Sequence, residues 1–184
     1  MEQGTVCFAR TGNVVILKLI GNIRYQMGPS LDDYLDHLFA RGDFEDILID
    51  LTETRMIDST CLGLLARIAN NIHDRFGRKA TIFSLHDDID RILEGVGFSA
   101  VFNIIHGDLP LDCKMEKIAD CDETREELAK TLYNSHRILC DLNEKNRAAF
   151  QNILDALRDD VPSISPPAPT TNEEKDKEDR NNKK

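Results

Sequence analysis

Three consecutive polar residues, Asp58, Ser59 and Thr60, carry the groups of this sequence that are best placed for chemistry. They follow a short apolar run and precede residues with helical spacing, so they should lie at the start of a helix. Asp, Ser and Thr are favoured there because their side-chain oxygens accept hydrogen bonds from the free N–H groups of the first turn. Those N–H groups and the helix dipole also favour an anion. The Ser59 hydroxyl could therefore carry a phosphate, although the same triplet could serve only as a cap.

The helix that follows should be amphipathic, and we expect Gly77 to end it. Its predicted inward face consists of Leu62, Leu65, Ala69, Ile72 and Phe76. Helical periodicity places Leu64 on the outward side, one turn from Ser59, either as a partner contact or as an ordinary exposed leucine. The residues that we expect to flank the hydroxyl and contact a partner are Asp58, Thr60, Gly63, Leu64 and Arg67.

The elements around this helix predict an α/β fold. Two Val- and Ile-rich runs flank a turn at Gly12, which indicates a β-hairpin. The apolar run 47–51 suits a strand covered on both faces, and it leads to Ser59 through a polar loop. The order β-β-α-β-α-β-α-β gives a mixed β-sheet with helices packed on it, and Ser59 at the carboxyl end of a strand, where such sheets commonly carry their sites. The predicted strands are 5–10, 13–20, 47–51, 80–85 and 101–105, and the predicted helices are 28–41, 59–76 and 87–95.

Composition narrows the class of protein. With 184 residues and 41% hydrophobic residues, the chain can form one ordinary domain with an appendage. A net charge of −10 argues against binding to nucleic acid or to an anionic membrane. The five cysteines form no C-x-x-C pair, and the sequence has no signal peptide or apolar run long enough to span a membrane. We therefore expect a soluble, cytoplasmic protein with reduced cysteines.

The other reactive groups in the sequence give weaker indications of function than Ser59 does. A helix N-terminus can lower a thiol pKa, so Cys61 could be a nucleophile, but no histidine lies near it in sequence. Asp87, Asp88 and Asp90 lack the spacing of a calcium loop and should begin a helix. The chain also has no glycine-rich phosphate loop. We expect no catalytic residues, no metal and no cofactor.

The chain changes character after residue 110. We divide it into a domain at 1–110, a linker at 111–119, a helical extension at 120–160 and a disordered tail at 161–184, which is rich in proline and charge.

The extension should begin at a capping box formed by Thr124 and Glu127. Its apolar stripe, interrupted at Ser135 and Asn146, predicts one long amphipathic helix or two shorter ones. The stripe should pack on its own domain or on a second copy, or dock a partner. His136 resembles a phosphotransfer histidine only faintly, and we expect it at the surface.

The order of elements and the run from Asp50-Leu51 to Ile57-Asp58-Ser59-Thr60 and Leu62-Gly63 resemble the STAS domain of bacterial anti-sigma factor antagonists. In that family a strand ending in D-L is followed by D-S-[ST]-G-L-G at the start of a helix. The resemblance covers about residues 5–110, and it is looser for the helical extension. Cys61 departs from the pattern because it stands where the family usually has glycine, which could affect phosphorylation of the loop.

The resemblance implies that the protein is not an enzyme but the substrate of one. It implies phosphorylation of Ser59 by an anti-sigma factor that is a GHKL-type serine kinase, and reversal by a PP2C-type phosphatase. The unphosphorylated form would then bind the anti-sigma factor and release a sigma factor. Two alternatives remain open: a non-phosphorylated STAS subunit of a larger assembly, such as a transport complex, and an enzyme that uses Cys61.

Overall fold

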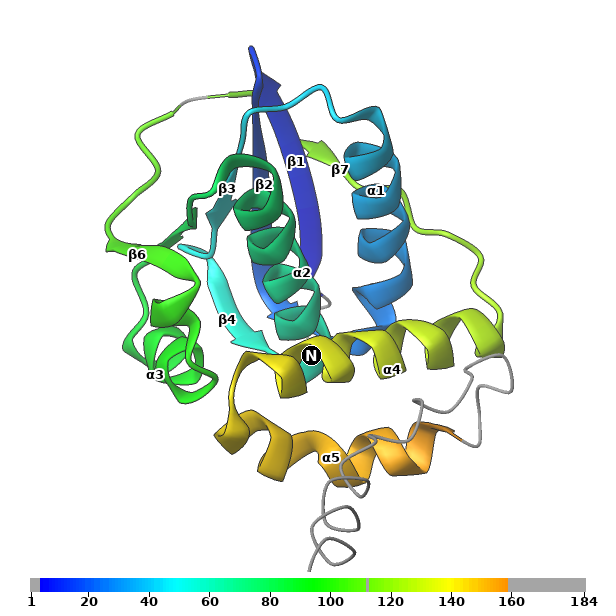
Figure 1. Cartoon of the computed structure of the whole chain (residues 1–184). Helices are drawn as coiled ribbons and strands as arrows, with labels where there is room; N and C mark the ends of the chain where they lie inside the picture. The colour runs from blue at the N-terminus through cyan, green and yellow to red at the C-terminus, as the bar shows by residue number, and fades with distance from the viewer. Residues whose placement is uncertain (1–3, 112, 159–184) are drawn as a thin grey trace, which may run out of the picture.

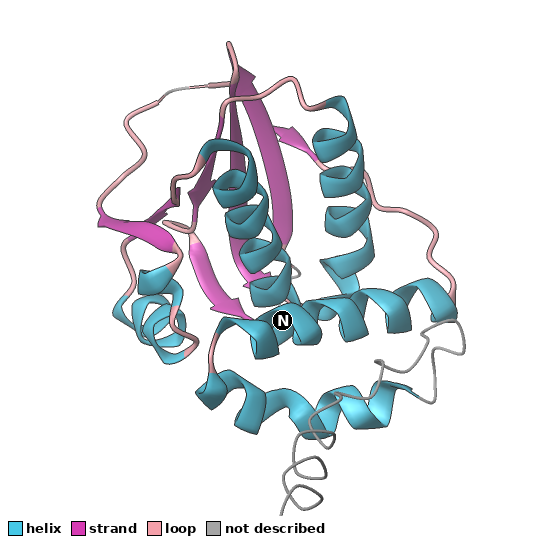
Figure 2. Cartoon of the chain, in the orientation of Figure 1, coloured by secondary structure: helices cyan, strands magenta, loops and turns pink. Residues whose placement is uncertain are grey.

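The computed structural model describes residues 4–111 and 113–158, and they form a sheet with helices packed against it (Figures 1 and 2). The strand order is β6-β5-β3-β2-β1-β7, with β4 pairing to β2. The strands β3, β5 and β6 extend the sheet in parallel from β2, whereas β1 and β7 are antiparallel additions at the other edge. The strands are β1 (Thr5–Thr11), β2 (Val14–Ile23), β3 (Asp46–Asp50), β4 (Thr54–Ile57), β5 (Ala80–Ser84), β6 (Phe102–His106) and β7 (Glu116–Lys117).

Five α-helices accompany the sheet in the described part of the chain: α1 (Gly28–Arg41), α2 (Ser59–Phe76), α3 (Asp87–Gly95), α4 (Arg125–Leu142) and α5 (Glu144–Arg158). Helices α1 and α2 lie side by side on one face of the sheet, and α4 crosses their ends with α5 beyond it (Figure 1). The predicted mixed α/β fold is confirmed. The predicted tail lies outside the described residues.

The main core follows from the apolar pattern of the strands and of α1 and α2. In the central strand β3, Ile47 and Ile49 are 0% exposed, as expected for a strand covered on both faces. On α2, Leu65 and Ile72 are also fully buried. Phe76 was predicted on this inward face, but it is 38% exposed. It is the last residue of the helix and lies beside the charged side chains of Arg75 and Arg78.

Several boundaries differ from the sequence prediction. The segment predicted as a polar loop before Ser59 contains β4, which pairs with the end of β2, and β2 itself runs three residues beyond its predicted end at Ile20. The strand β7 was not predicted because it has two residues and no apolar alternation. In the extension the capping box is present at Thr124 and Glu127, and the helix breaks at Asn143 into α4 and α5.

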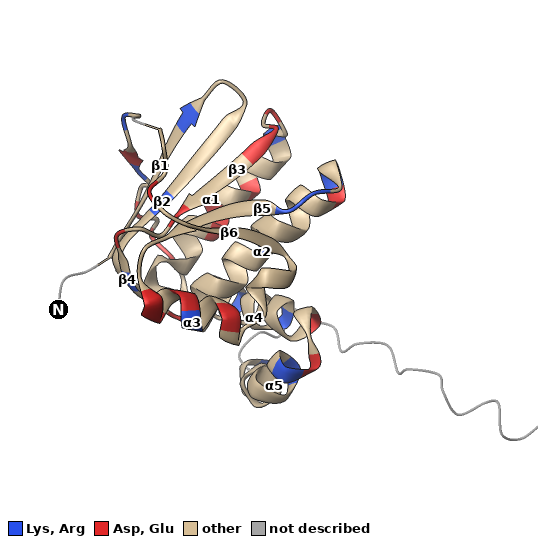
Figure 3. Cartoon of the chain, turned by 90° about the vertical axis from the view of Figure 1, so that its left-hand side faces the viewer, with Lys and Arg blue, Asp and Glu red and all other residues tan. Residues whose placement is uncertain are grey.

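Within the described residues, no helix is long and apolar enough to cross a membrane. Acidic residues are prominent along α3 (Figure 3), and Asp87, Asp88 and Asp90 occupy its first turn.

Candidate functional site

The carboxylate of Asp58 fixes the start of α2. Its Oδ1 accepts a hydrogen bond from the backbone N–H of Cys61 at 3.0 Å, so Asp58 is the N-cap. Its Oδ2 accepts from the backbone N–H of Tyr25 at 2.5 Å, which joins the helix start to the segment after β2. Capping is thus performed by Asp58, and the hydroxyl of Ser59 remains available for another contact.

That contact is with α4. The Ser59 Oγ lies 2.9 Å from Nε2 of His136, which is 77 residues away in the sequence. The other ring nitrogen, Nδ1, lies 2.7 Å from the carbonyl oxygen of Leu132. Because a carbonyl can only accept, Nδ1 carries the proton, Nε2 is left as an acceptor, and the Ser59 hydroxyl donates to it. His136 is 4% exposed, so the prediction of a surface histidine is wrong.

The outward face of α2 is also covered by α4. Thr60 is 3% exposed and Leu64 is 2% exposed, so the predicted exposure of Leu64 is wrong. The close approach depends on Gly63, because a Cβ there would lie 2.3 Å from the carbonyl oxygen of Ser135. The sequence predicted an amphipathic extension without a defined packing partner. In the structure, α4 of this extension packs on the first turns of α2.

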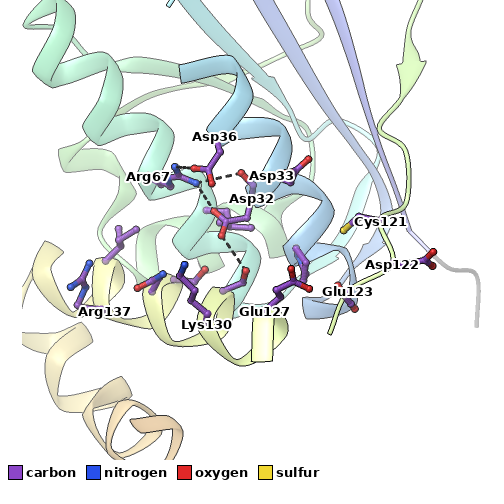
Figure 4. Close-up of a pocket in the computed structure, with 16 residues that line it drawn as sticks. Asp32, Asp33, Asp36, Arg67, Cys121, Asp122, Glu123, Glu127, Lys130 and Arg137 are labelled. Atoms are coloured by element: carbon purple, nitrogen blue, oxygen red, sulfur yellow. Dashed lines mark hydrogen bonds and ion pairs between the residues drawn. The ribbon is translucent and has the colours of Figure 1, made fainter. Parts of the chain in front are cut away.

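Arg67 lies at the edge of this contact, in a pocket between α1, α2 and α4 (Figure 4). Its guanidinium forms ion pairs with Asp32 and Asp36 of α1, and Asp32 also accepts a hydrogen bond from Thr131 of α4 at 3.1 Å. Burial raises the pKa of Asp32, and the charge of Arg67 partly opposes this shift. The pocket encloses about 480 Å³, and its wall also carries Asp33, Asp122, Glu123, Glu127, Lys130 and Arg137.

The other candidates for chemistry are not assembled into a site. Cys61 is fully buried, and burial, together with the charge of Asp58, raises its thiol pKa well above the usual range, so it is a poor nucleophile. Asp88 forms an ion pair with Arg91, and Asp90 lies 3.1 Å from His106. The described residues contain no group of three or more His, Cys, Asp or Glu side chains arranged to hold a metal ion.

Little in the sequence indicated which residues of α4 face Ser59. His136 lies on a buried face with Ala129, Tyr133 and Cys140, at helical spacings of four, three and four residues. That periodicity could have indicated a buried histidine. It could not have identified Ser59 as the partner, because the pairing depends on where α4 crosses α2.

The STAS domain family profile matches residues 8–108, which is more than half of the chain. The chain therefore belongs to the STAS domain family. A search of curated proteins finds no match.

Solved structures with a similar fold include the anti-sigma factor antagonist SpoIIAA in its unphosphorylated form, with a TM-score of 0.46 and 11% identity over 55% of this chain and 87% of that chain. SpoIIAA from Bacillus in the phosphorylated form gives 0.46 and 11% over 55% and 91% of the two chains. An anti-sigma factor antagonist from Mycobacterium paratuberculosis gives 0.46 and 17% over 55% and 85%.

Proposed function

We propose that this protein is a cytoplasmic anti-sigma factor antagonist whose binding to an anti-sigma factor is ended by phosphorylation of Ser59. The observation that carries the proposal is the placement of the Ser59 hydroxyl at the first residue of α2, with capping already performed by Asp58. The resemblance of the residues around Ser59 to the antagonist motif supports the same role. The kinase would be the anti-sigma factor itself, of the GHKL type, and a PP2C-type phosphatase would restore the free hydroxyl.

The physical basis of such a switch is electrostatic. A phosphoserine carries a charge of about −1.5 to −2 and three strong acceptor oxygens. The N-terminus of α2 can tolerate that charge because its free N–H groups and dipole favour an anion. A partner pressed against the same surface would have to desolvate the phosphate next to its own groups. A difference of about 3 kcal/mol between the two states already changes affinity more than a hundredfold.

The test uses the full-length chain with the candidate anti-sigma kinase and ATP. We expect the tryptic peptide 56–67 to gain one phosphate group, with fragmentation placing it on Ser59 rather than Thr60. Ser59→Ala should abolish the modification and Thr60→Val should retain it. Ser59→Ala should also bind the kinase at least tenfold more tightly than Ser59→Asp. Equal binding by these two variants would contradict the switch.

The second candidate is a non-phosphorylated STAS subunit of a larger assembly. The observation that favours it is the burial around Ser59, whose hydroxyl is already hydrogen bonded within the chain. In that case no incubation with the kinase would modify the peptide, and the Ser59→Ala and Ser59→Asp baits would capture the same proteins.

A further inference from the structure

The first turns of α2 form an interaction surface that the chain itself occupies. Three elements meet there, since a Cβ on Gly28 of α1 would lie 3.3 Å from the Thr131 methyl of α4 and 3.4 Å from the Thr60 methyl of α2. Next to this contact, Ser135 lies against Gly63, and His136 accepts a hydrogen bond from the Ser59 hydroxyl. Helix α4 therefore covers part of the surface around Ser59, which is only partly exposed.

The contact between Ser59 and His136 depends on a proton that phosphorylation removes. In the docked state the hydroxyl donates to Nε2, because Nδ1 is committed to the Leu132 carbonyl. A phosphoserine has no hydroxyl hydrogen at this position, and its oxygens are acceptors that carry negative charge. An acceptor would then face an acceptor in a partly buried contact, where unpaired polar groups are costly. A phosphate on the Ser59 Oγ would also have to share its surroundings with the His136 imidazole, whose Nε2 lies 2.9 Å from that oxygen.

The packing within the α4–α5 hairpin would allow it to move as a unit. It has an apolar cluster of its own, formed by Ala129, Tyr133, Cys140 and Leu154, which holds the two helices together. Leu139 is the fully buried hairpin residue in the main core cluster of the described chain, and Ile138, Leu142 and Phe150 pack against that cluster only partly buried. Asn143 and Asn146 also donate hydrogen bonds to the Val96 carbonyl. The segment between β6 and α4 contains only the two-residue strand β7 as regular structure among its described residues, so few backbone bonds tie the hairpin down.

The middle of the contact is polar, which suits an interface that opens. Two separate hydrogen bonds cross it, one between Ser59 and His136 and one from Thr131 to Asp32. The buried Ser135 hydroxyl has no hydrogen-bond partner among the described residues. Such groups regain water when the surfaces separate, so opening costs less than separating a purely apolar contact of the same size.

We propose that the α4–α5 hairpin is an autoinhibitory cover over Ser59. Docked, it shields the hydroxyl and the apolar side chain of Leu64, so a partner must displace it. Phosphorylation of Ser59 and docking of the hairpin exclude each other. The biological role of this cover rests on the proposed function. Its two physical claims, that phosphorylation releases α4 and that docked α4 limits access to residue 59, can be measured without any kinase.

The first claim is tested by hydrogen–deuterium exchange on the full-length chain with phosphoserine incorporated at position 59 by amber suppression, compared with Ser59→Ala. Peptides from 125–142 should exchange at least about tenfold faster in the phosphorylated chain, while peptides covering β3 and β5 stay unchanged and show that the domain remains folded. Equal or stronger protection of α4 in the phosphorylated chain would overturn the proposal and make His136 a phosphate clamp instead.

The second claim is tested through access to position 59. In a Ser59→Cys chain, alkylation of residue 59 by iodoacetamide is followed by fragment mass spectrometry, with and without Ser135→Leu, which forces α4 away from Gly63. Arg137→Leu is the matched control, since it changes an exposed residue of the same helix. We expect Ser135→Leu to raise the alkylation rate about tenfold or more and Arg137→Leu to leave it unchanged.

An unchanged alkylation rate in Ser135→Leu, with α4 shown by exchange to be released, would overturn the shielding. If both physical claims hold and the kinase still fails to modify Ser59, the proposed function fails while the cover stands.

Discussion

Gly63 lies directly against the backbone of Ser135, so that a Cβ on Gly63 would come within 2.3 Å of the Ser135 carbonyl oxygen. Glycine is unfavourable within a helix, and here it permits the close approach of two helices. The packing of α4 on α2 is therefore specified at one position by the absence of a side chain.

Gly63→Ala should destabilise the protein by about 1–3 kcal/mol, because the methyl group has to displace backbone rather than a flexible side chain. Gly95→Ala in α3 is the matched control. A Cβ at Gly95 meets nothing within 4 Å, so alanine should stabilise its helix by up to about 1 kcal/mol. Urea denaturation of both variants provides the comparison. A gain in stability for Gly63→Ala would show that α4 does not lie against α2 in solution.

His136→Phe keeps a ring against Phe150 but leaves the Ser59 hydroxyl without its acceptor. We expect a loss of about 1 kcal/mol in the free energy of unfolding, because a partly buried hydroxyl loses its hydrogen-bond acceptor. His37→Phe is the control, since its Nδ1 makes the same type of contact with the carbonyl of Asp33, four residues earlier, and its side chain is 75% exposed. Similar losses in the two variants would assign the effect to the local helical contact, not to Ser59.

Arg67→Met should make the protein less stable when the half-buried Asp32 carboxylate is ionised, because that charge loses its ion-pair partner. Burial already raises the Asp32 pKa, and loss of Arg67 should raise it further. An acid with a raised pKa binds its proton more tightly in the folded state, so its contribution to stability falls as the pH rises through the folded pKa. Relative to the native chain, Arg67→Met should therefore lose about 1–3 kcal/mol between about pH 4 and about pH 7.

Thermal or urea unfolding across that pH range measures this difference. Arg91→Met is the control, because its ion pair with Asp88 is exposed on both sides and should contribute nothing measurable. A pH profile for Arg67→Met that runs parallel to that of the native chain would contradict the role given to Arg67.

The Cys61 thiol should make stability fall at alkaline pH. Its folded pKa is far above the usual range, whereas the unfolded thiol ionises near pH ~8.5. The folded state therefore keeps a proton that the unfolded state releases, and stability declines by up to about 1.4 kcal/mol per pH unit above that point.

Cys61→Ala should have a shallower decline between about pH 8 and about pH 10, whatever the absolute loss from the cavity it leaves. The exposed Cys121 supplies a control, since Cys121→Ala should retain the native slope. If Cys61→Ala and the native chain decline in parallel, the thiol ionises in the folded protein and Cys61 regains interest as a nucleophile.

The sequence predicted those parts of the fold that are set locally. Asp58 and Gly77 mark the ends of α2, and the apolar run 47–51 is the central strand, because capping chemistry and burial on both faces leave clear patterns. The candidate site was located through the same cap. Periodicity also separated the two sides of α2, but it could not tell a surface facing solvent from one facing another helix.

That limit explains the errors at Leu64 and His136. Both lie in the contact between α2 and α4, which joins residues 77 positions apart at Ser59 and His136. Short strands such as β4 and β7 were missed for a related reason, since their pairing partners, β2 and β1, are specified by three-dimensional neighbours and not by alternation within a few residues.

The strand β7 gives the connection between the domain and the hairpin a second role. It pairs with Cys7 and Phe8 of β1, and the next residue, Ile118, donates to the Val6 carbonyl and is buried in the main core. Cutting the chain near residue 110 to isolate the family domain would remove this pairing and uncover Leu64 at the same time. The fragment would present an open strand edge and a bare apolar helix face, both of which promote aggregation. Recombinant work on this protein should therefore start from a chain that extends through α5.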